Sequence, residues 1–281
     1  MCEFCHQHGE GKKWYLRAEN YSEDLLSDVR RRKFIERFFT RAEDLGEDLE
    51  RLRKLDRLPG LLRGALVRVL SGRQKRNHFG QVVPIEDLER ILGFVNSIVR
   101  LPCICRKVTL GLERRYCYGL SLSPAGGELS RIVRGLERSF LAGPDTSGFE
   151  TLSKEEALRA LRAHEHEGLC HTVWTFGTPF IGGLCNCDRS DCIAMRATAT
   201  HGFPVLFRAE YVAEIDPEMC TGCRECMKAC QFGAITFSAA GKKAGVDARR
   251  CYGCGICRAS CAQGAVSLQD RASDPAASDL W

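Results

Sequence analysis

The sequence lacks an apolar run long enough to cross a membrane. Its longest apolar stretches, LLRGALVRVL and ILGFVNSIVR, are interrupted by arginines and fall short of the roughly 18 to 20 residues that a span needs. The start of the chain also lacks the apolar segment of a secretory signal, because only Met1 precedes Cys2 and the residues after Cys5 are polar and charged. These absences predict a cytoplasmic protein without a membrane partner.

Motifs of substrate-converting enzymes are missing as well. The chain contains no G-x-G-x-x-G nucleotide fingerprint, no G-x-x-x-x-G-K-[ST] phosphate loop and no convincing hydrolase arrangement. The net charge of +5 suits an acidic protein partner as well as nucleic acid, so it selects neither. Whether the protein is an enzyme stays open, and an electron carrier or an oxidoreductase subunit fits the sequence better than a stand-alone enzyme.

Cysteine, in contrast, is abundant. The chain has 17 cysteines in 281 residues. Because a reducing cytosol does not keep thiols as structural disulfides, so many cysteines indicate metal or redox chemistry.

Hydrophobic periodicity divides the first hundred residues into helices. Apolar residues recur at three- and four-residue steps from 23 to 57, which predicts two amphipathic helices with a break between 40 and 46. Residues 71–80, SGRQKRNHFG, are predicted to form an exposed loop. A helix is then predicted over 84–100, because Pro84 stands at its start and apolar residues follow along one side.

One further helix is predicted in the middle of the chain. Ser153 and Glu156 have the spacing of a capping box, and Gly168 stands where this helix would end. The chain as a whole is predicted to be α+β, with four parts: a helical part at 1–100, a cysteine-rich, loop-dominated middle at 101–210, a segment with an internal repeat at 211–270 and a flexible tail at 271–281.

The internal repeat carries the strongest motif. CTGCRECMKACQFGAITF, from Cys220, aligns with CYGCGICRASCAQGAVSL, from Cys251, and both copies contain C-x2-C-x2-C-x3-C. Such a run can hold three corners of an iron–sulfur cube, and in a two-cluster protein its fourth cysteine reaches the other cube. The predicted ligand sets are therefore crossed: Cys220, Cys223, Cys226 and Cys261 for one 4Fe-4S cluster, and Cys251, Cys254, Cys257 and Cys230 for the second.

These residues resemble the bacterial dicluster ferredoxin family over about 211–268. The resemblance implies two short β-pairings around two short helices, with AITF and AVSL as strands, and a role in one-electron transfer. That family has a proline after each fourth cysteine, whereas this chain has Gln231 and Ala262. The alternative interpretation is structural zinc in two cysteine knots, although tandem runs of this kind are unusual for zinc.

The middle of the chain supplies six further thiols. LPCICRK and GGLCNCDRSDC are similar to a module of larger cytosolic iron–sulfur proteins that carries C-x-C-R early and C-x-C-x4-C late, ahead of a dicluster ferredoxin part. The similarity implies a third iron–sulfur cluster or another metal site. Cys170 is predicted to be a buried small residue rather than a ligand, and His171 to pack or to donate a hydrogen bond. The candidate ligands of the middle are Cys103, Cys105, Cys117, Cys185, Cys187 and Cys192.

The first residues, MCEFCHQH, contain C-x-x-C-H, which is typical of covalent haem attachment. Haem attachment belongs to exported proteins, and no export signal is seen. Cys2 and Cys5 have the spacing at which two thiols face one zinc ion, and His8 is better placed than His6 to join them. A zinc site, two ligands lent to an iron–sulfur site, or an end without metal are the alternatives.

Basic residues are interleaved with carboxylates in the predicted N-terminal helices. Residues 30–33 and 51–57 contain arginines and lysines among Glu and Asp at helical spacing, which is typical of a solvated face. The pattern argues against nucleic acid as a partner, because it is not an uninterrupted basic stripe with stacking aromatics. A docking face for an acidic redox partner is the alternative.

The combined prediction is a polyferredoxin-like electron-transfer protein, with a flavoprotein or a metalloenzyme as its redox partner. The sequence leaves two alternative functions open. One is the electron-transfer subunit of a cytosolic oxidoreductase complex, and the other is an iron–sulfur sensor that binds nucleic acid through its basic helices.

Overall fold

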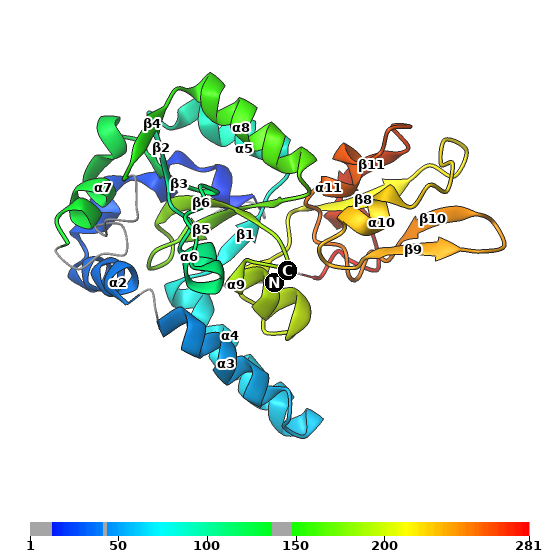
Figure 1. Cartoon of the computed structure of the whole chain (residues 1–281), viewed down its shortest axis with the longest axis horizontal. Helices are drawn as coiled ribbons and strands as arrows, with labels where there is room; N and C mark the ends of the chain where they lie inside the picture. Colours follow the sequence, from blue (N-terminus) through cyan, green and yellow to red (C-terminus); the bar gives the residue numbers. More distant parts are fainter. Residues whose placement is uncertain (1–12, 42–43, 137–147, 281) are drawn as a thin grey trace.

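The computed structural model describes residues 13–41, 44–136 and 148–280. It confirms the α+β class: a seven-stranded sheet with helices on both faces forms the larger body, and the C-terminal segment forms a small module at its side (Figure 1). Within the described ranges, no helix is long and apolar enough to cross a membrane.

The central sheet joins strands from the first half of the chain with strands from the middle. Its order is β4-β2-β3-β6-β5-β1-β7, and every pairing is antiparallel except that of β1 with β7. The strands are β1 (Gly80–Val82), β2 (Ser97–Leu101), β3 (Cys117–Ser121), β4 (Glu150–Leu152), β5 (Cys170–Thr175), β6 (Ile181–Cys187) and β7 (Leu206–Phe207).

One face of the sheet carries the main hydrophobic core. Side chains of α5 (Ile85–Phe94), α8 (Lys154–His166) and the 3-10 turns η1 (Trp14–Leu16) and η2 (Ala18–Tyr21) pack there against Ile98, Tyr118 and Leu184 of the strands. The capping box of α8 is present, with the Ser153 hydroxyl accepting from the Glu156 amide and the Glu156 carboxylate accepting from the Ser153 amide.

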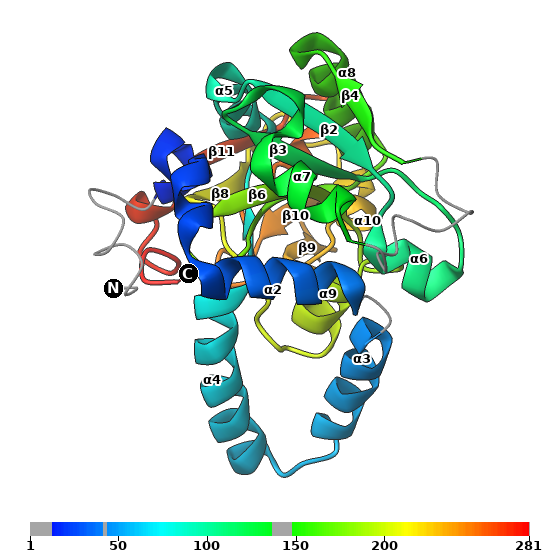
Figure 2. The same cartoon turned by 90° about the vertical axis from the view of Figure 1, so that its left-hand side faces the viewer.

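The opposite face is covered by a second set of helices. These are η3 (Glu23–Ser27), α2 (Val29–Thr40), α6 (Ile104–Leu110), η4 (Pro124–Gly126), α7 (Gly127–Arg134), α9 (Ile193–Met195) and the π-helical turn η5 (Arg196–Thr200). Helices α3 (Asp44–Leu55) and α4 (Gly60–Asn77) form a hairpin that projects from the body, with α3 contacting α6 and α9 (Figures 1 and 2).

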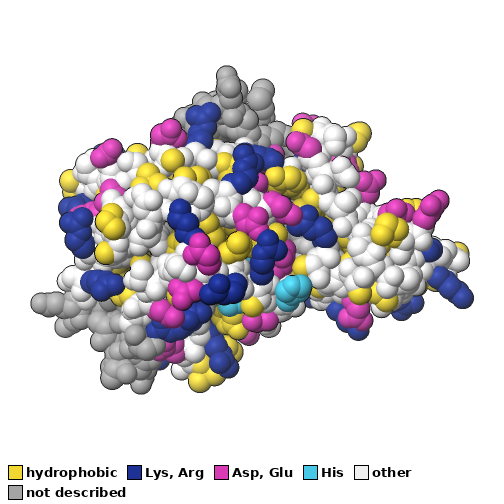
Figure 3. All heavy atoms as spheres, turned by 90° about the horizontal axis from the view of Figure 1, so that it is seen from above, with side chains coloured by type: hydrophobic (Ala, Val, Ile, Leu, Met, Phe, Trp, Pro, Cys, Tyr) yellow, Lys and Arg dark blue, Asp and Glu magenta, His cyan; other side chains and the backbone are white. Residues whose placement is uncertain are grey.

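The two predicted amphipathic helices are found as α2 and α3. On α3 the basic residues pair with neighbouring carboxylates as predicted: Arg51 contacts Glu47 at 3.1 Å and Asp48 at 2.7 Å. Basic and acidic side chains are interspersed in the same way on the face seen from above (Figure 3). Arg31 differs, because its Nε donates to the Gly177 carbonyl at 2.8 Å and thereby fixes α2 to the sheet.

The C-terminal module has the predicted arrangement of short strands and helices. β8 (Tyr211–Ile215) pairs with β11 (Val266–Asp270), and β9 (Ile235–Ser238) pairs with β10 (Lys243–Val246). α10 (Glu225–Ala229) and α11 (Ile256–Ala259) follow the cysteine loops.

The predicted helix at 84–100 and the predicted loop at 71–80 differ from the structure. The helix predicted over 84–100 stops at Phe94, where Val95 turns extended, and residues 97–101 form β2. Ile98 and Val99 are buried on opposite faces of the sheet. Apolar residues on both sides of this strand continued the apolar spacing of the preceding helix, so the sequence predicted one longer helix. The loop predicted at 71–80 is wrong, because α4 continues to Asn77 and β1 follows it.

The middle of the chain is a sheet rather than a set of loops. Gly182 and Gly183 lie in β6 where other side chains approach closely: a Cβ on Gly182 would clash with the Leu129 side chain. β2 also crosses residue 100, so strands from both sides of the predicted boundary pair directly with each other.

The segment predicted as a flexible tail is packed against the module. The turn η6 (Arg271–Ser273) opens it, and Arg271 and Ala277 are fully buried. Arg271 donates to the carbonyls of Ala209 at 2.8 Å, Tyr211 at 2.6 Å and Cys251 at 3.0 Å. Trp281 lies outside the described residues.

Candidate metal centres

The two cysteine loops of the module have the same backbone path. Gly222 and Gly253 hold positive φ angles of 72° and 67°, and a Cβ on either would clash with the carbonyl oxygen of Lys242 or Tyr211. Glycine is therefore required at both positions, and each loop passes directly beside a strand of the module.

Backbone amides surround the first thiol of each loop. The Ala213 and Gly253 amides donate to the Cys251 sulfur at 3.4 Å, and hydrogen bonds from the Ala244 and Gly222 amides lower the pKa of Cys220. N–H donors of this kind stabilise a thiolate and raise the potential of an iron–sulfur centre attached to it.

The fold brings the thiols of each predicted set together. Burial, followed by the nearby thiolates of Cys220, Cys223 and Cys261, raises the pKa of Cys226. Burial also raises the pKa of Cys257, and three thiols of its own set add to this effect, in the order Cys254, Cys251 and Cys230. Each set thus has a thiol of the other cysteine run nearby, as the crossed arrangement predicts, and Cys226 of the first set also lies near Cys257.

The two sets differ in their distance from the sheet. Cys223 is exposed, and Cys220 and Cys226 pack only among residues of the module. Cys254 and Cys230 also belong to a hydrophobic cluster that contains residues of the sheet body, among them Cys170, Cys187 and Cys192. We call the first set (Cys220, Cys223, Cys226, Cys261) the outer set and the second (Cys251, Cys254, Cys257, Cys230) the inner set.

The six thiols of the middle lie on one face of the sheet and beside it. Cys117 and Cys185 are register partners on β3 and β6, and Cys187 follows two residues later on the same face. Cys103 and Cys192 cap the N-termini of α6 and α9, and Cys105 lies in the first turn of α6. The thiols form a continuous chain of contacts in the order Cys187, Cys192, Cys105, Cys103, Cys117 and Cys185.

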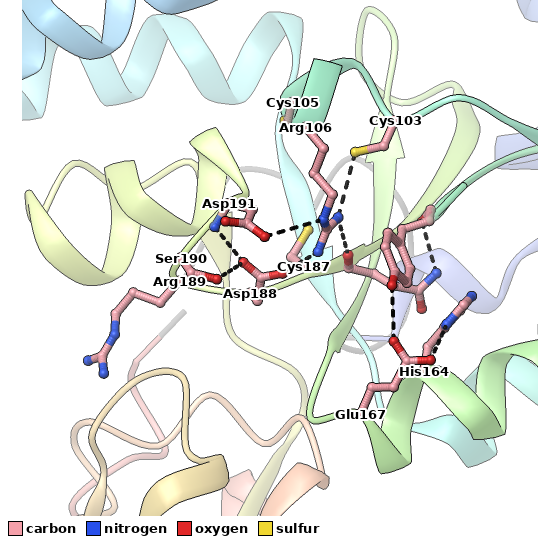
Figure 4. Close-up of polar contacts among 12 residues, drawn as sticks. Cys103, Cys105, Arg106, His164, Glu167, Cys187, Asp188, Arg189, Ser190 and Asp191 are labelled. Atoms are coloured by element: carbon pink, nitrogen blue, oxygen red, sulfur yellow. Dashed lines mark hydrogen bonds and ion pairs between the residues drawn. The ribbon is translucent and has the colours of Figure 1, made fainter. Parts of the chain in front are cut away.

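An arginine lies against this six-thiol group. Arg106 is buried, and its Nη1 donates to the Cys103 sulfur at 3.6 Å and to the Asn186 carbonyl at 3.2 Å (Figure 4). Its charge is balanced by Asp188, which accepts from Nη2, and by Asp191 at 3.9 Å. Hydrogen bonds from the Cys105 and Cys117 thiols, together with Arg106, lower the pKa of Cys103.

Sequence reasoning did not single out Arg106, Asp188 and Asp191. The signal was present in both motifs, because the arginine directly follows C-x-C and the two aspartates lie between Cys187 and Cys192.

Cys170 and His171 are placed as predicted, inside the fold. Cys170 is fully buried between the six-thiol group and the inner set, pairs in register with Cys187, and hydrogen-bonds with the Cys254 thiol. His171 points to the other face of the sheet, where its Nδ1 contacts Asn186 Oδ1 at 2.6 Å. Burial lowers the pKa of His171 to about 4, so its ring is neutral.

Gln231 stands where the resembling family has proline. Its Nε2 donates to the Gly168 carbonyl at 2.8 Å, and its Oε1 accepts from the Arg189 amide at 2.9 Å. Gln231 follows Cys230 of the inner set, and Arg189 lies between Cys187 and Cys192. This departure from the family pattern therefore connects the module to the loop that carries two of the six thiols.

The donor chemistry of these sites fits iron–sulfur clusters. Every candidate ligand that the structure describes is a thiol, the ligand type that iron–sulfur clusters take. Among the described residues, no three His, Cys, Asp or Glu side chains are arranged to hold a single metal ion. Cys2, Cys5 and His8, the residues of the predicted zinc site, lie outside the described residues.

Comparison with known proteins agrees with the module. Residues 213–236 match the family model described as a 4Fe-4S binding domain, which covers the first cysteine run. No curated protein matches the chain. The match and the thiol geometry support an iron–sulfur electron-transfer protein.

Proposed function

We propose that this chain relays electrons through three iron–sulfur centres held by the outer set, the inner set and the six-thiol group. Each centre, when bound, takes up and releases one electron. The observation that carries the proposal is the placement of the inner set: it shares a hydrophobic cluster with Cys170, Cys187 and Cys192 and is joined to their loop by Gln231.

The protein's own residues would set the direction of the relay. The exposure of Cys223 supports the outer set as the centre that exchanges electrons with a partner at the surface. Arg106 would stabilise a negatively charged centre at the six thiols, because it donates to Cys103 and is held in place by two aspartates.

The test is the iron, acid-labile sulfide and zinc content of protein purified without oxygen. We expect roughly 12 iron atoms per chain with matching sulfide. Roughly 8 iron atoms together with zinc would contradict a third cluster, and negligible sulfide would contradict electron transfer altogether.

Single substitutions then assign the ligands. Cys223→Ala and Cys185→Ala should each alter the iron content and the electron paramagnetic resonance signal of a different centre. Cys170→Ala is the control, since this thiol is fully buried inside the fold but belongs to no predicted set. A loss of roughly 4 iron atoms in the control would show that the ligand assignment is wrong.

A second candidate is an electron-transfer subunit of a larger cytosolic oxidoreductase of anaerobic metabolism, with a flavoprotein or a metalloenzyme as the partner. It is favoured by the surface of α4, where Leu61 is 93% exposed, Val69 71% and Leu62 63%. The sequence of α4 contains five basic residues and no Asp or Glu, so an acidic partner fits it. Gentle purification at low salt should recover a complex that Arg68→Glu weakens, whereas a chain that stays alone under these conditions argues for a free carrier.

A further inference from the structure

The six-thiol group forms only one wall of a larger cavity. The cavity has a volume of about 540 Å³ and is lined by residues of the sheet and of the α3–α4 hairpin. Among the described residues, its other walls carry no thiol: they include leucines of α3, Leu70 of α4 and a group of aromatic residues. A metal centre at the thiols therefore does not account for this part of the cavity. The cavity as a whole, thiol wall included, is within the roughly 300–1,000 Å³ of small-molecule sites.

The walls select an uncharged ligand. Leu45, Leu49 and Leu52 line the side formed by α3, and Phe38 and Trp174 line the side near the sheet. The charged residues of the lining are Asp48, Arg51, Arg73 and Arg106. Arg51 pairs with Asp48, Arg106 pairs with Asp188, and Arg73 is exposed to solvent.

One polar side chain lies among the aromatic residues. The His78 ring is 4.6 Å from Phe38, 4.8 Å from Trp174 and 5.1 Å from Phe176, measured between ring centroids. Its Nδ1 contacts the Thr175 carbonyl, so Nδ1 carries the proton and Nε2 is a hydrogen-bond acceptor. Burial lowers the pKa of His78 to about 4, which keeps the ring neutral.

From this lining we infer that the cavity binds an uncharged aromatic molecule with one hydrogen-bond donor, stacked among the aromatic residues and donating to His78. Aromatic side chains provide flat apolar surfaces that favour stacked or edge-on rings. The inference goes beyond the proposed function, because it gives an electron carrier a small-molecule site beside its third centre. A redox role for the bound molecule rests on the proposed electron transfer, but the binding itself does not.

The test uses 2-naphthol as the probe, with the anaerobically purified full chain and titration calorimetry. We expect saturable binding of one molecule per chain. 2-Methylnaphthalene, which lacks the donor, should bind about fivefold more weakly, the effect of one hydrogen bond. 2-Naphthoate, which carries a charge into an apolar site, should bind at least tenfold more weakly than 2-naphthol. Tighter binding of 2-naphthoate would overturn the inference.

Two variants locate the site. Leu52→Trp fills the cavity from α3 and should weaken 2-naphthol binding at least tenfold, whereas Leu61→Trp, on the 93% exposed position of α4, should leave it unchanged. His78→Phe should weaken 2-naphthol about fivefold and leave 2-methylnaphthalene unaffected. Equal binding by Leu52→Trp and the original chain would refute the site.

Iron and sulfide are measured on the same preparations. Full iron content without 2-naphthol binding means that the ligand site is refuted and the electron relay stands. Binding of 2-naphthol by protein that contains no sulfide means that the electron relay is refuted and the ligand site stands.

Discussion

At residue 253 the backbone leaves no space for a side chain. Gly253 and Gly264 both hold positive φ angles, but a Cβ at 253 would clash with the Tyr211 carbonyl, whereas a Cβ at 264 would lie 3.9 Å from Met219. We expect Gly264→Ala to cost about 1–2 kcal/mol, the left-handed penalty alone. Gly253→Ala should cost more and should also impair cluster incorporation. Thermal unfolding and iron content check both variants, and equal losses would show that the clash is relieved.

His171 gives the stability of the protein a defined dependence on pH. Because burial lowers its folded pKa to about 4 from an ordinary 6.5, the folded state favours the neutral ring. Its contribution is fully present above pH 6.5 and is lost as the pH falls toward 4. Between pH 7 and 5.5 the original chain should lose about 1 kcal/mol more than His171→Gln. Urea unfolding measures this, with exposed His166→Gln as the control that should behave like the original chain.

At the scale of elements, the C-terminal turn η6 is fixed by one buried side chain. Arg271 donates to three carbonyls, including that of Cys251 in the inner set. Arg271→Ala leaves these carbonyls buried without their donor and should destabilise the module by about 3 kcal/mol. Exposed Arg249→Ala should change its stability by less than about 0.5 kcal/mol. Denaturant unfolding followed by the visible absorbance of the module compares the two, and similar values would mean that water replaces the guanidinium.

Elements with local signals could be predicted from the sequence. The capping box at Ser153, the cysteine runs and the strands AITF and AVSL all depend on residues close together in the chain. β2 could not be recognised, because Ile98 and Val99 pack on opposite faces that distant segments provide. The six candidate thiols of the middle were named from their spacing, but their gathering on one face depends on the pairing of β3 with β6.

At the scale of the whole molecule, the module is joined to the sheet by Gln231. Gln231→Ala removes hydrogen bonds of 2.8 and 2.9 Å to Gly168 and Arg189 and should weaken the contact by about 1–3 kcal/mol. We expect faster hydrogen exchange at the Arg189 amide, which loses its acceptor, and slower reduction of the proposed third centre, with unchanged iron content. Exposed Gln263→Ala, in the corresponding part of the second cysteine run, should show neither effect. Unchanged exchange at the Arg189 amide would mean that the remaining apolar contacts hold the module alone.

The different burial of the thiols also predicts the order in which they are oxidised when the protein is exposed to air. Cys223 of the outer set is exposed, while Cys254 and Cys257 of the inner set and most of the six middle thiols are buried. If the proposed centres are present, oxygen should therefore bleach the one at the outer set first and the one at the six-thiol group last. A partly oxidised sample would keep the visible absorbance of its buried centres but would no longer accept electrons from a partner through the outer set.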